Sequence, residues 1–267
     1  MHQRRALLIA CSLIATITAV FVMNQFAHSE PAADAQPRVF EIRTYTTEPG
    51  KLPDLLKLFH DPVIKLFEKH GLTAIGYWLP TDEPRSKDTL IYILAHDSRD
   101  AAKKSWADFK ADPEWIKARE ECEAGGKIFH KIESVFADPT DFSTLTRSAP
   151  ATAADAKQRV FEIRTYYTEP GKLPDLLKRF RDHTTKLFEK HGMTNIAYWV
   201  PSDEPHSQDT LIYILAHESR DAAKKSWEGF RADPDWIKAR DASEAAGKIV
   251  HNMESVFADP TDFSAIK

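Results

Sequence analysis

Hydrophobic and polar positions follow two periodicities along the chain, and together they predict alternating strands and helices. Residues 39–46 alternate between apolar and polar side chains and are rich in β-branched and aromatic types, which predicts a strand. Residues 53–70 carry apolar side chains three or four positions apart, which predicts a helix that ends at Gly71. Further strands are predicted at 73–79, 89–96 and 127–136, and a second helical segment, restarted at Pro113, at 98–124.

The whole pattern occurs twice in the chain. Residues 38–145 align with residues 159–266 without a gap, and 81 of the 108 aligned positions are identical. Such high identity indicates a recent duplication, so a residue shared by both copies is not thereby functional. The sequence predicts a first domain at 36–145, a linker rich in Ala, Ser and Thr at 146–158, and a second domain at 159–267.

Each copy reads as β-α-β-β-α-β, the order of a ferredoxin-like domain. Two crossovers of this kind give a four-stranded antiparallel sheet with helices on one face. The other face of the sheet needs cover, and the second copy can supply it within the same chain. The predicted fold class is therefore α+β, with two tandem ferredoxin-like domains pairing as an intrachain α+β barrel.

The first 35 residues have the organisation of a secretory signal. Two arginines precede an uncharged run at 6–23, and small residues follow it, so cleavage is expected after Ser29 or Ala35. The protein is therefore expected to be exported, periplasmic or extracellular. The run is also long for a signal peptide, so an uncleaved signal anchor that holds the protein to a membrane is the alternative.

Composition and charge narrow the function classes. The chain is 42% hydrophobic and 28% charged, as is ordinary for a globular protein, and its net charge of −4 with no basic cluster argues against nucleic-acid binding. Paired cysteines of the zinc-binding type are absent, and Cys122 is expected to pack as a small helix residue. His130 and Glu133 lie three apart in a strand, face opposite sides and cannot chelate together. Neither a metal nor a cofactor is predicted.

Four short motifs, present in both copies, resemble the NIPSNAP family. In the first copy they are Val39-Phe40-Glu41-Ile42-Arg43-Thr44-Tyr45, Pro49-Gly50-Lys51, Tyr77-Trp78 and Asp112-Pro113-Glu114-Trp115. In the second they are Glu162-Ile163-Arg164-Thr165-Tyr166, Pro170-Gly171-Lys172, Tyr198-Trp199 and Asp233-Pro234-Asp235-Trp236. The resemblance covers nearly all of both copies and implies the dimeric α+β barrel superfamily. Some relatives in that superfamily are cofactor-free monooxygenases or haem-degrading enzymes, which is an analogy of fold alone.

The first strand of each copy suggests a candidate ligand site. Phe40 and Ile42 point to one face, which we expect to meet the helices, so Glu41 and Arg43 are expected to face the barrel interior. The candidate residues are Glu41, Arg43, Tyr45, Tyr92, His96 and His130 in the first copy, and Glu162, Arg164, Tyr166, Tyr213, His217 and His251 in the second. Arginine, tyrosine and histidine side chains can hold an anionic or aromatic small molecule. The alternative is a structural Glu41–Arg43 ion pair in a filled barrel.

The two copies differ most clearly in the first helix. The residues Leu58, His60, Pro62, Val63 and Ile64 become Arg179, Arg181, His183, Thr184 and Thr185. One explanation is an extra contact of the first copy with a partner chain or with the membrane-proximal segment. The other is drift on two non-equivalent surfaces.

Two functions remain open at this point. The first is an extracytoplasmic NIPSNAP-like protein of undefined activity that binds a small ligand or a protein partner. The second is a cofactor-free, monooxygenase-like or haem-handling enzyme. No catalytic residue is assigned, a homo-oligomer is compatible with the pattern, and contact with a membrane is expected only through the N-terminal segment. An empty polar barrel would favour the enzyme, and a packed barrel the binding protein.

Overall fold

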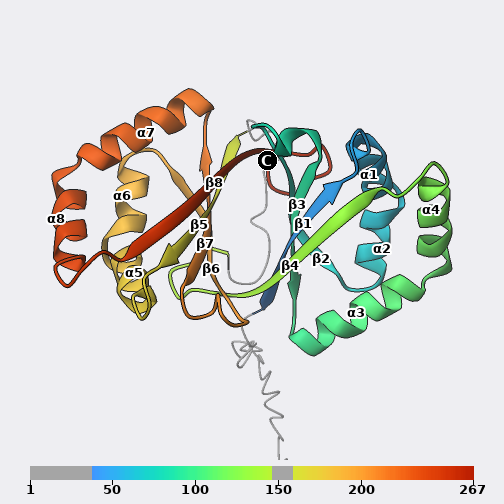
Figure 1. Ribbon diagram of the computed structural model, residues 1–267, viewed down its shortest axis with the longest axis horizontal. Helices are drawn as coiled ribbons and strands as arrows, with labels where there is room; N and C mark the ends of the chain where they lie inside the picture. The colour runs from blue at the N-terminus through green and yellow to red at the C-terminus, as the bar shows by residue number, and fades with distance from the viewer. Residues whose placement is uncertain (1–37, 146–158) are drawn as a thin grey trace, which may run out of the picture. The chain divides into compact units, whose positions relative to one another are not determined.

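The computed structural model describes residues 38–145 and 159–267 (Figure 1). The predicted signal segment and the linker at 146–158 lie outside these residues. The strands are β1 (Val39–Thr47), β2 (Thr73–Pro80), β3 (Thr89–His96), β4 (Phe129–Pro139), β5 (Val160–Thr168), β6 (Thr194–Pro201), β7 (Thr210–His217) and β8 (Val250–Pro260). The helices are α1 (Leu52–Leu58), η1 (Phe59–Val63), α2 (Ile64–Lys69), η2 (Arg85–Lys87), α3 (Arg99–Ala111), α4 (Pro113–Glu123), α5 (Leu173–Arg179), η3 (Phe180–Thr184), α6 (Thr185–Lys190), α7 (Arg220–Ala232) and α8 (Pro234–Ser243). None of these helices is long and apolar enough to cross a membrane.

The helix boundaries follow from local capping chemistry. Ser98 accepts a hydrogen bond from the Ala101 amide at 3.0 Å and so begins α3. Asp112 separates α3 from α4, and its carboxylate accepts from the Glu114 amide at 2.9 Å. The sequence did not predict the π-helical turn η1 between α1 and α2. There Asp61 is extended, as residues before a proline tend to be.

The strands close into one barrel shared by both repeats. Around the barrel the order is β1-β3-β2-β8-β5-β7-β6-β4. Each repeat contributes four of these strands, and the repeats join where β2 pairs with β8 and where β4 pairs with β6. In Figure 1 the helices α1–α4 cover one half of the barrel and α5–α8 the other. The predicted intrachain α+β barrel is therefore confirmed.

The barrel interior is apolar and packed by residues from both repeats. Phe40 lies against Trp199 with ring centroids 5.5 Å apart, and Trp78 lies against Phe161 at 5.7 Å. One buried cluster unites these rings with Ile42, Ile75, Ile91, Ile93, Ile163, Ile196, Ile212 and Ile214. The two facing sheets thus provide the cover that each lacks alone.

The predicted orientation of the strands was wrong. Glu41 and Arg43 face outward, beneath the helices, whereas Phe40 and Ile42 face into the barrel. None of the residues predicted to line the interior belongs to the interior cluster, namely Glu41, Arg43, Tyr45, Tyr92, His96, His130, Glu162, Arg164, Tyr166, Tyr213, His217 and His251. The physical reason is that both faces of β1 and β3 are covered, by the barrel interior on one side and by the helices on the other. Alternation therefore separates two sets of side chains without saying which set is inside.

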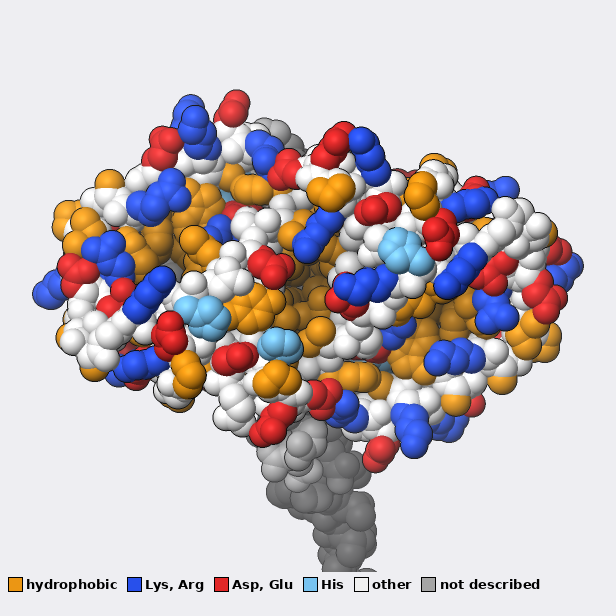
Figure 2. Space-filling model, viewed as in Figure 1, with side chains coloured by type: hydrophobic (Ala, Val, Ile, Leu, Met, Phe, Trp, Pro, Cys, Tyr) orange, Lys and Arg blue, Asp and Glu red, His pale blue; other side chains and the backbone are white. Residues whose placement is uncertain are grey.

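Two further apolar clusters fill the layers between the sheet and the helices. In the first repeat Tyr45 and Tyr92 pack against Leu55, Phe59 and Phe67 of the helices. Outside these layers, Figure 2 shows charged side chains of both signs spread over the visible face, with hydrophobic side chains at the floor of hollows between them. The sheet–helix layers are therefore one place where incomplete packing can leave a cavity.

Ion pairs across the junction fix the repeats to each other. The guanidinium of Arg99 donates to the carboxylate of Asp203 at 3.0 Å, and Arg220 donates to Asp82 at 3.0 Å. The same two arginines lie over rings at the barrel mouth, Arg99 over Phe136 at 4.2 Å and Arg220 over Phe257 at 3.8 Å. The barrel frame is therefore nearly symmetric.

Candidate functional site

A buried carboxylate organises the sheet–helix layer of the first repeat. The Glu41 carboxylate accepts hydrogen bonds from Trp106 Nε1 at 2.7 Å and Ser134 Oγ at 2.6 Å. It also shares a 3.0 Å hydrogen bond with His96 Nε2 and forms an ion pair with Arg43. The Arg43 guanidinium in turn lies 4.4 Å from the Trp106 ring. These contacts join β1, β3 and β4 to α3.

The second repeat builds the same network. Glu162 accepts from Trp227 Nε1 at 2.7 Å and from Ser255 Oγ at 2.7 Å. It is bonded to His217 Nε2 at 3.1 Å and paired with Arg164. We call these two sets the glutamate networks.

The networks keep their carboxylates ionised. Burial alone would raise the pKa of Glu41, but the His96 hydrogen bond, the Arg43 charge and the remaining donors outweigh it and lower that pKa to about 2. The same contacts lower the pKa of Glu162 to about 2. A carboxylate held so low, with its oxygens already bonded, is a weak proton acceptor. The glutamate networks therefore act as structural ties rather than as general bases.

Of the candidate residues, the structure brings together the glutamate, arginine, two tyrosines and the first histidine of each repeat. Arg43 Nη2 donates to Tyr45 Oη at 3.2 Å, and the Tyr45 ring lies 5.3 Å from that of Tyr92. His130 does not join them. It is exposed and sits where a register shift between β1 and β4 interrupts the pairing.

Sequence reasoning missed two members of each network. Trp106 and Trp227 are absent from the predicted candidate residues, yet their indole N–H groups donate hydrogen bonds to the buried glutamates. Ser134 lies directly opposite Arg43 in the strand register, and Ser255 opposite Arg164. A buried carboxylate needs several hydrogen-bond donors. That requirement is the signal that could have identified these tryptophans and serines.

A cavity of about 380 Å³ opens in the sheet–helix layer of the second repeat. Its lining residues are Tyr166, Arg179, Phe180, Thr184, Phe188, Phe230, Trp236, Lys248, Val250, His251, Asn252 and Met253. Aromatic rings form the walls, and a few basic and polar groups accompany them. This size and this lining are typical of a small-molecule site.

Apolar side chains occupy three matching positions of the first repeat, and one of them is larger than its counterpart. Phe129 stands where the second repeat has Val250, and its ring lies 5.3 Å from the ring of Tyr45. Leu58 and Val63, which match Arg179 and Thr184, are buried in the helix–sheet cluster. The Phe129 ring fills space that Val250 leaves open, whereas Leu58 and Val63 make this layer less polar than Arg179 and Thr184 do. The cavity therefore arises from differences between the copies.

The helix differences do not need a contact outside the chain. Leu58 and Val63 are buried within their own repeat. His60 lies against Phe263 of the other repeat, with ring centroids 6.0 Å apart, and Arg181 donates to Asp141 at 2.6 Å. The differences at these three pairs of positions thus follow contacts inside the barrel protein, and the explanation by an external partner is not required there.

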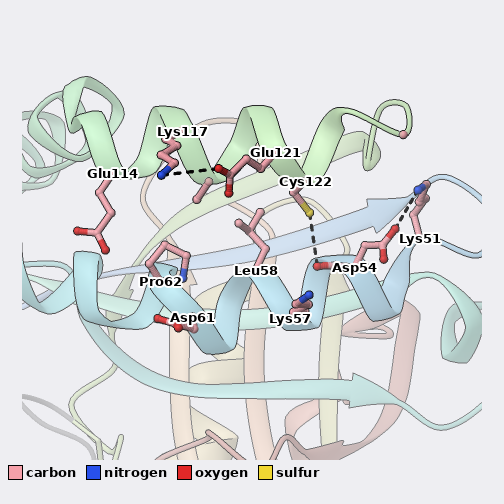
Figure 3. A pocket seen from close by; sticks show the side chains of 12 residues that line it. Lys51, Asp54, Lys57, Leu58, Asp61, Pro62, Glu114, Lys117, Glu121 and Cys122 are labelled. Carbon is pink, nitrogen blue, oxygen red and sulfur yellow. Dashed lines mark hydrogen bonds and ion pairs between the residues drawn. The ribbon is translucent and has the colours of Figure 1, made fainter.

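A larger hollow of about 610 Å³ lies between α1 and α4 of the first repeat (Figure 3). Its lining is mostly charged, and Lys51 Nζ lies 2.8 Å from the Asp54 carboxylate. Cys122 Sγ lies 3.7 Å from the Asp54 carbonyl oxygen. Burial raises the pKa of the Cys122 thiol, so it is not an activated nucleophile. This hollow lacks the apolar walls of a small-molecule site.

Within the described residues, no group of His, Cys, Asp and Glu side chains could hold a metal ion. The histidines at the helix ends have protein partners instead. His70 Nε2 lies 2.7 Å from Asp112, and His191 Nε2 lies 2.7 Å from Asp233. These pairs tie α2 to α4 and α6 to α8.

Comparison with known proteins identifies the domain type. The sequence model of the NIPSNAP family matches residues 40–144 and 161–265. A NIPSNAP family protein of unknown function from Agrobacterium tumefaciens is 26% identical, over 41% of this chain and 95% of its own, with a TM-score of 0.36. No curated protein matches the sequence.

Two further solved structures resemble the whole barrel. A putative monooxygenase from Lactobacillus acidophilus is 10% identical over 84% of this chain and 94% of its own, with a TM-score of 0.54. Another from Fusobacterium nucleatum is 9% identical over 84% and 92%, with a TM-score of 0.51. At such low identity the likeness shows the fold alone.

The glutamate networks predict a specific loss of stability in acid. Because folding lowers the pKa of Glu41 and Glu162 from 4.5 to about 2, their contribution is complete above pH 4.5. It disappears as the pH falls toward 2, by about 3 kcal/mol per carboxylate. Urea unfolding between pH 7 and pH 2 should therefore show a steep acid decline for the wild type.

The double variant Glu41→Gln/Glu162→Gln should be less stable at pH 7 and should show a flatter decline below pH 4.5. Glu121→Gln, which changes an exposed side chain of α4, serves as the control and should keep the wild-type slope. An unchanged slope in the double variant would show that these carboxylates are not the linked groups.

Proposed function

The chain belongs to the NIPSNAP family, and from this premise we propose that its second repeat binds one small, aromatic and anionic organic molecule. The observation that carries the proposal is the aromatic-walled cavity of about 380 Å³ between β5, β8 and the helices α5–α8. Its volume falls in the range of small-molecule sites, which are typically apolar with a few placed polar groups.

The walls of the cavity favour a flat, apolar ligand. Phe180, Phe188 and Phe230 are buried, so their edges and faces offer dispersion contacts with little exposure to water. Burial of ligand surface against such rings contributes roughly 25 cal/mol per Å². The polar side chains Lys248, His251 and Asn252 come from one end of β8 and its approach, so a polar group of the ligand would lie on that side.

The packed barrel interior supports binding in the sheet–helix layer. Trp78 and Trp199 are fully buried inside the barrel with the isoleucines around them. By contrast, the cavity lies where Val250 and Thr184 leave room. The barrel interior is thus the scaffold, and the binding site is a feature of the outer layer.

A second candidate is cofactor-free oxygenation of the same ligand. The likeness of the fold to proteins titled putative monooxygenases favours it. Such chemistry needs a base within reach of the substrate, and His251 is the imidazole that lines the cavity.

Oxygen consumption that depends on ligand and is lost in His251→Ala would favour this candidate, and binding without turnover would favour the first. A haem-handling role is tested by including haem in the same titrations.

We also propose that the protein works outside the cytoplasm, on the signal pattern at residues 1–35. If so, mature protein recovered from the envelope or medium of a bacterial host should begin at Glu30 or at Gln36. Mass spectrometry of the intact protein distinguishes this from an uncleaved anchor. Full-length protein in the cytoplasmic fraction would contradict both forms of export.

Filling the cavity should abolish binding. Val250→Phe places in the second repeat the ring that Phe129 contributes to the first, and isothermal titration with 2-naphthoate should show at least about a tenfold loss of affinity. Phe129→Val, the reciprocal change in the first repeat, should leave the affinity of the existing site unchanged. Equal binding by wild type and Val250→Phe would place any ligand elsewhere.

A further inference from the structure

We infer that Arg179 binds a carboxylate of the ligand and selects aromatic acids over neutral aromatic molecules. This inference rests on the proposed binding function and names its ligand class. It comes from one side chain that has no arginine counterpart in the first repeat, where Leu58 holds the position.

Arg179 is a buried charge beside the aromatic cluster of the second repeat. Its side chain is only 4% exposed, and it ends α5 against the aromatic cluster. Removing a guanidinium from water is costly unless partners replace the lost hydration. The first repeat avoids this cost with Leu58, so the fold itself does not need an arginine here.

The partners of Arg179 within the described residues are incomplete. Its Nη1 donates to Ser243 Oγ at 3.1 Å and to Glu244 Oε1 at 3.0 Å. Its Nε–H is buried and has no acceptor within the described residues. A guanidinium presents five N–H donors in a fork that matches the two oxygens of a carboxylate. The unpaired Nε–H therefore needs a hydrogen-bond acceptor, and a ligand in the adjoining cavity can supply one.

The surrounding groups also favour an anion beside an aromatic body. The guanidinium carbon lies 5.2 Å from the centre of the Trp236 ring, so charge and ring adjoin in the same wall. Lys248, a second cation that lines the cavity, makes no ion pair within the described residues, whereas Glu244 is the one carboxylate paired with Arg179. Arg179 and Lys248 carry two positive charges at the site and Glu244 carries one negative charge. The site therefore has a net positive charge, which favours an anionic ligand.

The other titratable groups that line the cavity are His251 and Tyr166. Neither of them supplies a negative carboxylate to compete with a ligand anion. The Arg164 guanidinium lies 3.2 Å from Met253 Sδ and is paired with Glu162. Its Nε–H also lacks an acceptor within the described residues, but Arg164 does not line this cavity. Arg179 is therefore the buried guanidinium of the cavity lining that has an N–H donor left for the ligand.

The test compares two probes of matched shape, the anion 2-naphthoate and the neutral 2-naphthamide, by isothermal titration. Wild type should prefer the naphthoate by at least about tenfold, as expected for a charge-assisted hydrogen bond. Arg179→Leu installs the residue that the first repeat carries at this position. It should bring the two affinities within about threefold of each other by weakening naphthoate alone.

The outcomes separate the inference from the proposed function. If wild type binds neither probe, the proposed function is wrong. If wild type binds both equally and Arg179→Leu changes neither, the cavity is a site but the carboxylate assignment is overturned. Should Arg179→Leu fail to fold, Arg179→Lys is the second test. It keeps the positive charge but loses the forked pair of N–H donors, so the preference for naphthoate over naphthamide should fall severalfold. An unchanged preference in Arg179→Lys would overturn the inference.

Discussion

The strands β1–β3 and β5–β7 are largely buried on both faces, between the shared barrel interior and the helices, and the rest of the structure depends on that constraint. The closed barrel turns one face of all eight strands inward, where two repeats must share a single interior. A shared interior is best filled by large apolar rings, and Trp78 and Trp199 lie there fully buried. The Glu–Arg pairs of β1 and β5 consequently lie in the outer layer, beneath the helices, whereas residues 130–134 of β4 are exposed.

That outer layer is stable because its buried carboxylates are fully matched. The carboxylates of Glu41 and Glu162 each contact donor side chains from three strands and one helix. Burial alone would disfavour these charges, but the contacts stabilise them and link the sheet to the helix. The two networks use equivalent residues in the two repeats. Within this common frame, the Phe129 ring fills space in the first repeat that Val250 leaves open in the second. Arg179 adds a charge where the first repeat has Leu58.

Much of the fold could be predicted from the sequence because its signals are local. The strand at 39–46 became Val39–Thr47, and the helix cap at Ser98 holds as expected. The duplication and the uncovered sheet face were enough to predict the barrel. The orientation of the strands could not be predicted, since Phe40 and Glu41 are both buried, on opposite faces.

The cavity of the second repeat was beyond sequence reasoning for a different reason. It depends on a difference in volume between Phe129 and Val250, which the alignment shows only as one substitution among 27. The divergent helix was recognised, but its meaning depends on Leu58 and Val63 pointing into the sheet–helix layer rather than outward. Such directions follow from tertiary packing and not from periodicity.

If the difference between the repeats creates the site, the site can be transferred. The variant Leu58→Arg/Val63→Thr/Phe129→Val gives the first repeat the key lining residues of the second. Titrated with 2-naphthoate, wild type should bind one molecule per chain and the folded triple variant two. A folded triple variant that still binds one molecule, with circular dichroism and melting like the wild type, would contradict the claim that these positions make the site.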